Sequence, residues 1–180
     1  MRDRERLPIV GVMGSGRQPH EERAGALGRW LARQGVHLLT GGGGGVMESV
    51  SRAFCEVADR RGLSIGVLPG WEGAGARGAR AGYPNPWVEI PLHTHLPLSG
   101  DRGTDPRSRN HINVLSSDVL VALPGGAGTA SEVRLALHYG RPLVAYLEHR
   151  SEIEGLPAEA VVSPSLAGVQ GFVRSQLAQL

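Results

Sequence analysis

Three glycine-rich turns are the first features of this sequence whose spacing could support chemistry. They are Gly14-Ser15-Gly16, Gly41 to Gly45 and Gly125 to Gly128. Each turn follows a short apolar run and precedes a segment of helical periodicity, so each is predicted to join a strand to a helix. Glycine lets the backbone approach an anion closely, and the free N–H groups at a helix start attract negative charge. One such turn would be explained by ordinary turn chemistry, but the three together predict a phosphate-bearing ligand.

The groups expected to contact this ligand come from the three turns and from the start of a later helix. They are Gly14, Ser15, Gly42, Gly43, Gly44, Gly45, Asn110, Gly125, Gly126, Gly128 and Thr129.

Arg109 and Glu132 are the two side chains best placed for a catalytic role. The helix expected over 107–117 rises about 16 Å at 1.5 Å per residue, and the strand expected over 118–123 returns about 20 Å at 3.3 Å per residue. The chain therefore comes back to the edge that it left, and both side chains can face one crevice. Simpler roles are open as well. Thr129-Ala130-Ser131-Glu132 has the pattern of a capping box, and an arbitrary helical arginine is exposed to solvent.

Composition excludes several other chemistries. All 19 basic residues are arginine. Without lysine, the protein is neither a pyridoxal-phosphate-dependent lysine decarboxylase nor a Walker-type nucleotide binder. The formal net charge is only +2 and the acidic and basic residues are interleaved, so no binding to nucleic acid is expected.

Cysteine and histidine give no support for a metal site. Cys55 is the only cysteine and is expected to be a small core residue, which excludes an internal disulfide and a cysteine-rich zinc site. His93 and His95 have a spacing able to hold a metal, but no third ligand is evident nearby. A polar rim of the binding pocket is the preferred interpretation of the two histidines, and no metal is expected.

Short apolar runs alternate with longer segments of helical period along most of the chain. This pattern predicts a Rossmann-like, doubly wound α/β fold with a mainly parallel sheet and helices on both faces. Strands are expected over 9–13, 36–40, 63–68, 88–92, 118–123 and 143–147. Helices are expected over 20–34, 46–61 and 107–117, from the end of the third glycine turn to about residue 139, and in the tail after residue 168.

One domain is expected over residues 1–180, with a flexible N-terminus over 1–8 and a mobile loop over 71–86. The N-terminus lacks the apolar run of a signal peptide, and no stretch approaches the ~18 apolar residues of a membrane-spanning helix. A soluble cytoplasmic protein with no membrane partner is therefore expected.

The block PGGAGTASE, residues 124–132, resembles the PGGxGTxxE signature of the LONELY GUY (LOG) family, whose members are often mislabelled as lysine decarboxylases. Arg109 falls in register with the active-site arginine of that family. The resemblance extends to GVMGSG near the start, to LLTGGGGGVMESV at 38–50 and to IGVLPG at 65–70, and it covers most of the chain from Ile9 to about Tyr146.

The resemblance implies an activity. LOG enzymes are phosphoribohydrolases that cleave the N-glycosidic bond of cytokinin riboside monophosphates or AMP and release a free base and ribose 5-phosphate. Glu132 would then stabilise the positive charge that develops on the ribose and activate water, while Arg109 would hold ribose or phosphate oxygens. The hydrolase requires no cofactor. The resemblance also implies a homodimer or a higher homo-oligomer whose partner subunit helps to complete the pocket.

Three differences from the family hydrolases point to a second function. Those enzymes usually carry Arg-Lys and a double Glu where this chain has Arg109-Asn110 and Ser131-Glu132, and their second glycine loop is one residue longer than Gly41 to Glu48. These features resemble the branch that contains the molybdenum cofactor carrier proteins, which bind this phosphate-bearing pterin cofactor without a reaction. The hydrolase is our leading hypothesis, a carrier with the molybdenum cofactor as its ligand is the alternative, and a nucleotide sensor is a third possibility.

Overall fold

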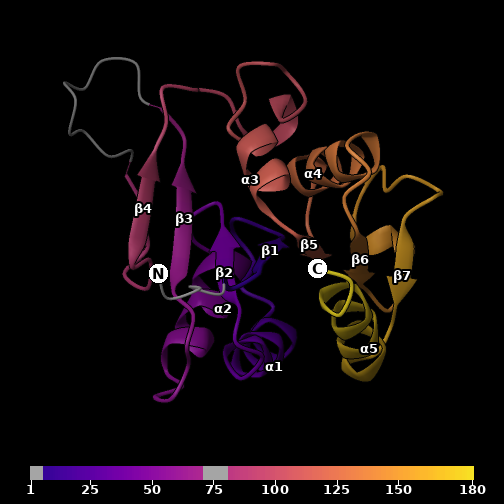
Figure 1. The fold of residues 1–180 in the computed structure, drawn as a ribbon. Coiled ribbons are helices and arrows are strands. Elements are labelled where there is room, and N and C mark those ends of the chain that lie inside the picture. Colours follow the sequence, from indigo (N-terminus) through magenta and orange to yellow (C-terminus); the bar gives the residue numbers. More distant parts are fainter. Residues whose placement is uncertain (1–5, 71–80) are drawn as a thin grey trace.

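The computed structural model describes residues 6–70 and 81–180 (Figure 1). Its seven strands form one parallel sheet in the order β4-β3-β2-β1-β5-β6-β7. The strands are β1 Ile9–Met13, β2 His37–Thr40, β3 Ser64–Leu68, β4 Ile90–His93, β5 Val119–Ala122, β6 Leu143–Tyr146 and β7 Val161–Ser163. The helices are α1 Glu21–Ala32, α2 Val46–Cys55, α3 Asn110–Ser116, α4 Ala127–His138 and α5 Leu166–Leu177, with short 3-10 turns η1 Gly100–Arg102 and η2 Arg150–Glu152.

Helices cover both faces of this sheet, and the alternation of side chains along the strands creates a core on each face. Val119 and Val121 of β5 point into the core beneath α1, α2 and α5. Leu120 and Ala122 of the same strand point into the opposite core, beneath α3 and α4. Strands buried on both faces are typical of parallel sheets, and the predicted doubly wound, Rossmann-like fold is confirmed.

The order of the strands reverses at the centre of the sheet, where β1 pairs with β2 on one side and with β5 on the other. In doubly wound folds this switch point leaves a crevice at the carboxyl ends of the strands, where ligands bind. The loops that follow β1 and β5 meet there, and the N–H of Ser15 donates to the carbonyl oxygen of Pro124 at 3.0 Å. Two of the three glycine turns are therefore held side by side.

Several element boundaries differ from those expected. Helix α2 ends at Cys55 rather than near residue 61, and α3 begins at Asn110 rather than at 107. The backbone before α3 is occupied by turns, because Asp105 accepts hydrogen bonds from the N–H groups of Arg107 and Ser108. Strand β7 was not expected, because its three residues are too few to show an alternating pattern.

The organisation as one domain over 1–180 stays a prediction. The flexible N-terminus expected over 1–8 and the mobile loop expected over 71–86 fall mostly outside the described residues.

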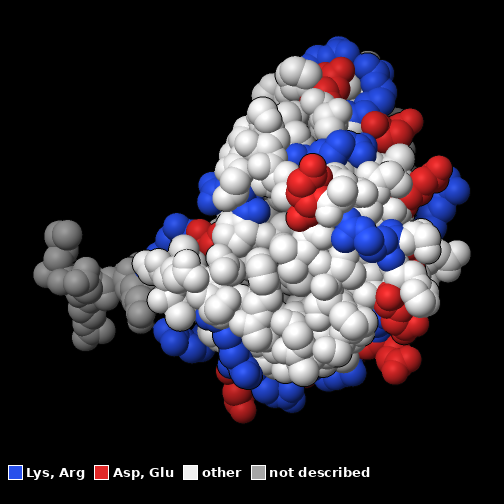
Figure 2. All heavy atoms as spheres, turned by 90° about the vertical axis from the view of Figure 1, so that its right-hand side faces the viewer, with Lys and Arg blue, Asp and Glu red and all other residues white. Residues whose placement is uncertain are grey.

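Acidic and basic side chains are intermixed on the face that carries β7 and α5 (Figure 2). This face shows no broad patch of one sign, as the interleaved charges of the sequence suggested. Among the described residues, no helix has the length and apolar character needed to cross a membrane.

Candidate functional site

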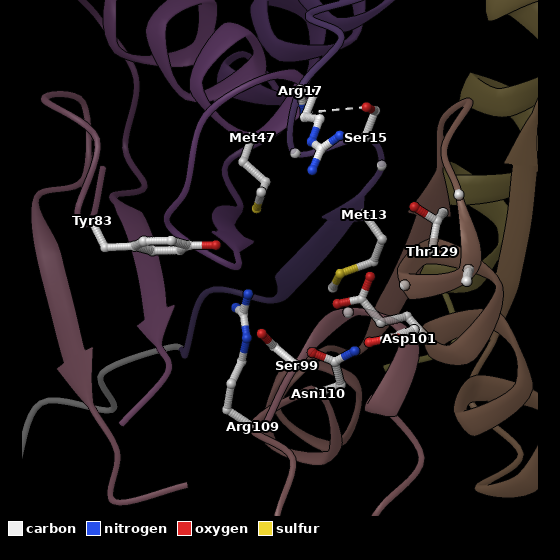
Figure 3. Close-up of a pocket in the computed structure, with 17 residues that line it drawn as sticks. Met13, Ser15, Arg17, Met47, Tyr83, Ser99, Asp101, Arg109, Asn110 and Thr129 are labelled. Atoms are coloured by element: carbon white, nitrogen blue, oxygen red, sulfur yellow. Dashed lines mark hydrogen bonds between the residues drawn. The ribbon is translucent and has the colours of Figure 1, made fainter. Parts of the chain in front are cut away.

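A cavity of about 630 Å³ opens at the switch point between β1 and β5 (Figure 3). This volume lies within the range of small-molecule binding sites, about 300 to 1,000 Å³. The loops after β1 and β5, the η1 turn and the starts of α3 and α4 form its walls. It is lined by Met13, Gly14, Ser15, Gly16, Arg17, Met47, Tyr83, Ser99, Gly100, Asp101, Arg109, Asn110, Gly126, Ala127, Gly128, Thr129 and Glu132.

The start of α4 is suited to hold an anion. The helix begins at Ala127, and Gly126, Gly128 and Thr129 line the cavity. The first N–H groups of a helix have no partner within it, and the helix dipole favours a negative charge there. The first turn of α4 carries no acidic residue, whereas the first turn of α1 carries Glu21 and Glu22. An anionic ligand group would therefore meet no fixed negative charge in the first turn of α4.

Ser15 adds a donor on the opposite loop. Its Oγ accepts hydrogen bonds from the backbone N–H groups of Arg17 at 3.2 Å and Gln18 at 2.9 Å. Because these two bonds use the lone pairs of the oxygen, the hydroxyl hydrogen is left to donate to a ligand. In Figure 3 the guanidinium of Arg17 also points toward the cavity.

Arg109 precedes α3 and is only 5% exposed. Its Nη1 donates to the carbonyl oxygen of Val67, at the end of β3, at 2.7 Å. The guanidinium also packs against Gly41, where an added Cβ would lie 2.6 Å from Nη2. The glycine at the end of β2 therefore makes room for the arginine, whose position is fixed by two neighbouring strands.

Glu132 is 8% exposed and lines the same cavity. The amide Nδ2 of Asn113, on α3, donates to its Oε1 at 3.0 Å. Burial raises the pKa of Glu132, and this effect outweighs the charge of Arg109 and the hydrogen bond from Asn113, both of which lower the pKa. The carboxyl group therefore accepts a proton more readily than an exposed glutamate does.

The predicted capping box is wrong. It required Thr129 to precede the helix, but α4 begins two residues earlier and Gly126 is its N-cap. Glu132 therefore lies in the second turn of the helix, and its carboxyl group binds Asn113 instead of a free backbone N–H. The simpler role that the sequence left open for Glu132 is removed.

The two positions that depart from the family hydrolases contact each other. Asn110 donates from Nδ2 to Oγ of Ser131 at 3.2 Å. An uncharged hydrogen bond thus joins α3 to α4 where those enzymes usually carry a lysine and a glutamate. The Arg109 and Glu132 side chains beside this pair remain at the cavity.

The structure brings eight of the predicted site residues together and leaves five away from the cavity wall. Those that line it are Gly14, Ser15, Arg109, Asn110, Gly126, Gly128, Thr129 and Glu132, and those that do not are Gly42, Gly43, Gly44, Gly45 and Gly125. A Cβ at Gly45 would overlap the loop after β1, and one at Gly125 would overlap the Thr129 side chain. These glycines allow the loops to pack closely, and any contact of the five with a ligand stays a prediction.

Sequence reasoning missed several residues of the site. Asn113 lies four residues after Arg109 and three after Asn110, a spacing that places it on the same side of the helix, so helical periodicity could have identified it. No periodic signal marks Tyr83 and Ser99, which lie outside helices and strands, or Asp101, which lies on the short η1 turn.

The histidines and the cysteine lie elsewhere. His93 on β4 and the following His95 are exposed and do not line the cavity, in contrast to the expected polar rim. Within the described residues, no group of three His, Cys, Asp or Glu side chains could hold a metal ion. Cys55 is partly buried against the core, and burial raises the pKa of its thiol.

A model of one protein family, the SLOG cluster4 family, matches residues 7–163. The chain belongs to the SLOG cluster4 family. This confirms the resemblance to the LOG proteins, on the branch close to the molybdenum cofactor carriers.

This SLOG cluster4 protein is similar to a phosphoribohydrolase and to two proteins that bind or carry the molybdenum cofactor. A cytokinin riboside 5'-monophosphate phosphoribohydrolase from Rhodococcoides fascians is 28% identical, over 93% of this chain and 87% of its own length. The molybdenum cofactor binding protein from Rippkaea orientalis is 32% identical with a TM-score of 0.75, covering 96% of this chain and 98% of the other. The molybdenum cofactor carrier protein of Chlamydomonas reinhardtii is 33% identical with a TM-score of 0.70, covering 96% and 99%.

Proposed function

We propose that this SLOG cluster4 protein binds a phosphorylated, ring-bearing small molecule in the cavity, and that this ligand is the molybdenum cofactor, held without conversion. The observation that carries the proposal is that the anion-accepting start of α4 and the buried guanidinium of Arg109 open onto one cavity of about 630 Å³. A phosphate would bind at the helix start, where N–H groups and the dipole favour it.

Apolar and aromatic groups at the cavity are suited to hold a flat ring. In Figure 3 the thioethers of Met13 and Met47 and the hydroxyl end of Tyr83 point toward the open space. Methionine adapts to irregular surfaces and makes favourable contacts with aromatic rings, and tyrosine offers an apolar ring with a polar tip. A pterin carrying a phosphate fits this combination of one anion-binding end and one end that accepts a ring.

Two observations favour the carrier over the hydrolase, which was the leading hypothesis from the sequence. The molybdenum cofactor proteins are 32% and 33% identical over 96% of this chain, whereas the hydrolase is 28% identical. The uncharged Asn110–Ser131 contact also replaces the charged pair typical of the hydrolases. A carrier needs a stable fit to its ligand and no group that reacts.

Hydrolysis of a nucleoside 5'-monophosphate is the second candidate, because Arg109 and Glu132 line one cavity. The departing base leaves positive charge on the ribose, which the carboxylate of Glu132 would stabilise while it activates water. The hydrogen bond from Asn113 would hold this carboxylate in place. Arg109 would bind ribose or phosphate oxygens.

One preparation tests both candidates. The protein is purified under mild conditions and analysed for molybdenum and for the fluorescence of oxidised pterin, and a second portion is incubated with AMP and other nucleoside monophosphates. The carrier hypothesis predicts that molybdenum and pterin copurify with the wild-type protein and are lost in Arg109→Met. They should be retained in Arg33→Met, which replaces an exposed arginine that does not line the cavity. The hydrolase predicts free base that Glu132→Gln abolishes. Absence of both results would reject both functions.

The homo-oligomer implied by the LOG resemblance stays a prediction. Sedimentation at working concentration would test it, and a protein that is only monomeric would contradict it.

A further inference from the structure

We propose that Asn110 is a specificity-determining residue that requires the ligand to present an N–H or O–H donor to its amide oxygen. This inference rests on the proposed binding function of the cavity. It adds a chemical requirement for the part of the ligand that lies beside α3.

The orientation of the Asn110 amide follows from the hydrogen bonds of its partner. Oγ of Ser131 contacts the carbonyl oxygens of Gly128 at 2.7 Å and Gly100 at 3.2 Å. A carbonyl oxygen can only accept, so the single hydrogen of the Ser131 hydroxyl is used there. Ser131 must therefore act as acceptor toward Asn110, and the nitrogen of the amide faces Ser131 at 3.2 Å.

Close packing keeps the amide in this orientation. A Cβ added at Gly103 would overlap both Nδ2 of Asn110 and Oγ of Ser131, so the backbone after η1 presses directly on the pair. Asn110 itself is 2% exposed. A rotation that exchanged the oxygen and nitrogen of the amide would place two acceptors together at Ser131 and is disfavoured.

The amide oxygen is consequently an acceptor without a partner. Oδ1 of Asn110 is buried and makes no hydrogen bond with any described residue. The residue lines the cavity, and in Figure 3 its amide lies beside Ser99 in the cavity wall, so a ligand donor reaches Oδ1 only by entering the wall there. A buried acceptor that has lost water and gained no donor is unfavourable, so a ligand that supplies a donor recovers the lost hydrogen bond.

The same wall carries further acceptors. The carboxyl groups of Asp101, on η1, and Glu132, on α4, line the cavity together with Asn110. A set of acceptors fits a ligand portion with several adjacent donors. The edge of a 2-amino-4-oxo ring, as in a pterin or guanine, has this character, and so do the hydroxyl groups of a ribose. The shared chemistry is a group of N–H or O–H donors, and the experiment separates the two sources.

The test compares dissociation constants for wild type and Asn110→Leu, measured by titration calorimetry. The probes are GMP, IMP, which lacks the 2-amino group, 2'-deoxy-GMP, which lacks one hydroxyl, a pterin phosphate, and inorganic phosphate. Asn110→Leu is expected to weaken GMP or pterin phosphate binding by about tenfold or more and to leave inorganic phosphate unchanged. The loss should disappear for IMP if the 2-amino group donates and for 2'-deoxy-GMP if the 2'-hydroxyl donates, and it should persist for both if the ring N–H donates.

Two further variants keep the result decisive. Asn110→Ala removes the amide oxygen without adding bulk and should lose the preference for donor-bearing probes even if Asn110→Leu folds poorly. Ser51→Ala, a buried polar residue of α2 that does not line the cavity, should bind every probe as wild type does. Equal weakening of all probes by Asn110→Leu, or no weakening, would overturn the inference alone. If no probe binds to the wild-type protein, the proposed function fails and the inference fails with it.

Discussion

Gly41→Ala should displace Arg109 without replacing any residue that lines the cavity. The added Cβ would lie closest to Nη1, the atom that donates to Val67, and 2.6 Å from Nη2, where an ordinary contact needs about 3.5 Å, so the guanidinium must withdraw by roughly 1 Å or more. Its hydrogen bond to the carbonyl oxygen of Val67, now 2.7 Å, would then exceed the usual limit. A hydrogen bond to a charged group contributes about 1.5 to 3 kcal/mol.

The expected consequences are measurable in two assays. A loss of about 2 kcal/mol corresponds to a decrease of roughly 4 to 8 °C in the melting temperature of a chain of this size. Ligand affinity, measured by calorimetry, should decrease by about tenfold or more, because the arginine no longer occupies its position. Gly171→Ala is the control, because its Cβ would meet nothing within 4 Å and the residue lies on α5. A Gly41→Ala protein with wild-type affinity would refute the role assigned to Arg109.

Three other variants test the remaining contacts of the site. Burial raises the pKa of Glu132, so wild type loses stability as pH rises from the unfolded to the folded pKa of this group; Glu132→Gln lacks this loss and should match wild type near pH 4 but melt at a higher temperature than wild type at pH 8. Equal melting temperatures of the two proteins at pH 8 would contradict this. Asn113→Leu removes a donor to the carboxylate, so it should raise the pKa of Glu132 further and move the pH dependence of ligand affinity upward; an unchanged profile would exclude this coupling. Gly128→Ala places a Cβ 2.9 Å from Cα of Gly100, so it should push η1 away from α4. The free energy of unfolding should fall by about 1 to 3 kcal/mol, and ligand binding should weaken. A stability equal to that of wild type would contradict the close packing of these two segments.

Much of the fold is predictable because burial on both faces leaves a clear trace in the sequence. The continuous apolar runs at Ile9–Met13 and Val119–Ala122 have no polar residue facing solvent, which is the pattern of a central parallel strand. The short edge strand β7 leaves no such trace, because three half-exposed residues resemble a loop. The helix expected from residue 107 begins later, at Asn110, because Asp105 stabilises a separate turn before it.

The candidate site was predictable only in part, for a physical reason. The loops that meet at the switch point could be predicted from two signals in the sequence. The glycine turns are a local signal of close packing, and the alternation of strands and helices is a periodic signal of the topology. The contact between Asn113 and Glu132, and the one between Asn110 and Ser131, join two helices that are separated by a strand. No spacing within one element specifies such pairs. The packing of Gly100, on η1, against Gly128 of α4 likewise joins segments that the local sequence does not connect.

The central claim is that a phosphorylated ligand binds at the start of α4 with its remaining part beside Arg109, and a structure of the protein with its copurified or added ligand tests this most directly. The account predicts phosphate oxygens within hydrogen-bonding distance of the backbone N–H groups of Gly128 or Thr129, and a ring or sugar that approaches Arg109 and Asn110. A ligand bound at another surface, with the crevice between β1 and β5 left open, would contradict it.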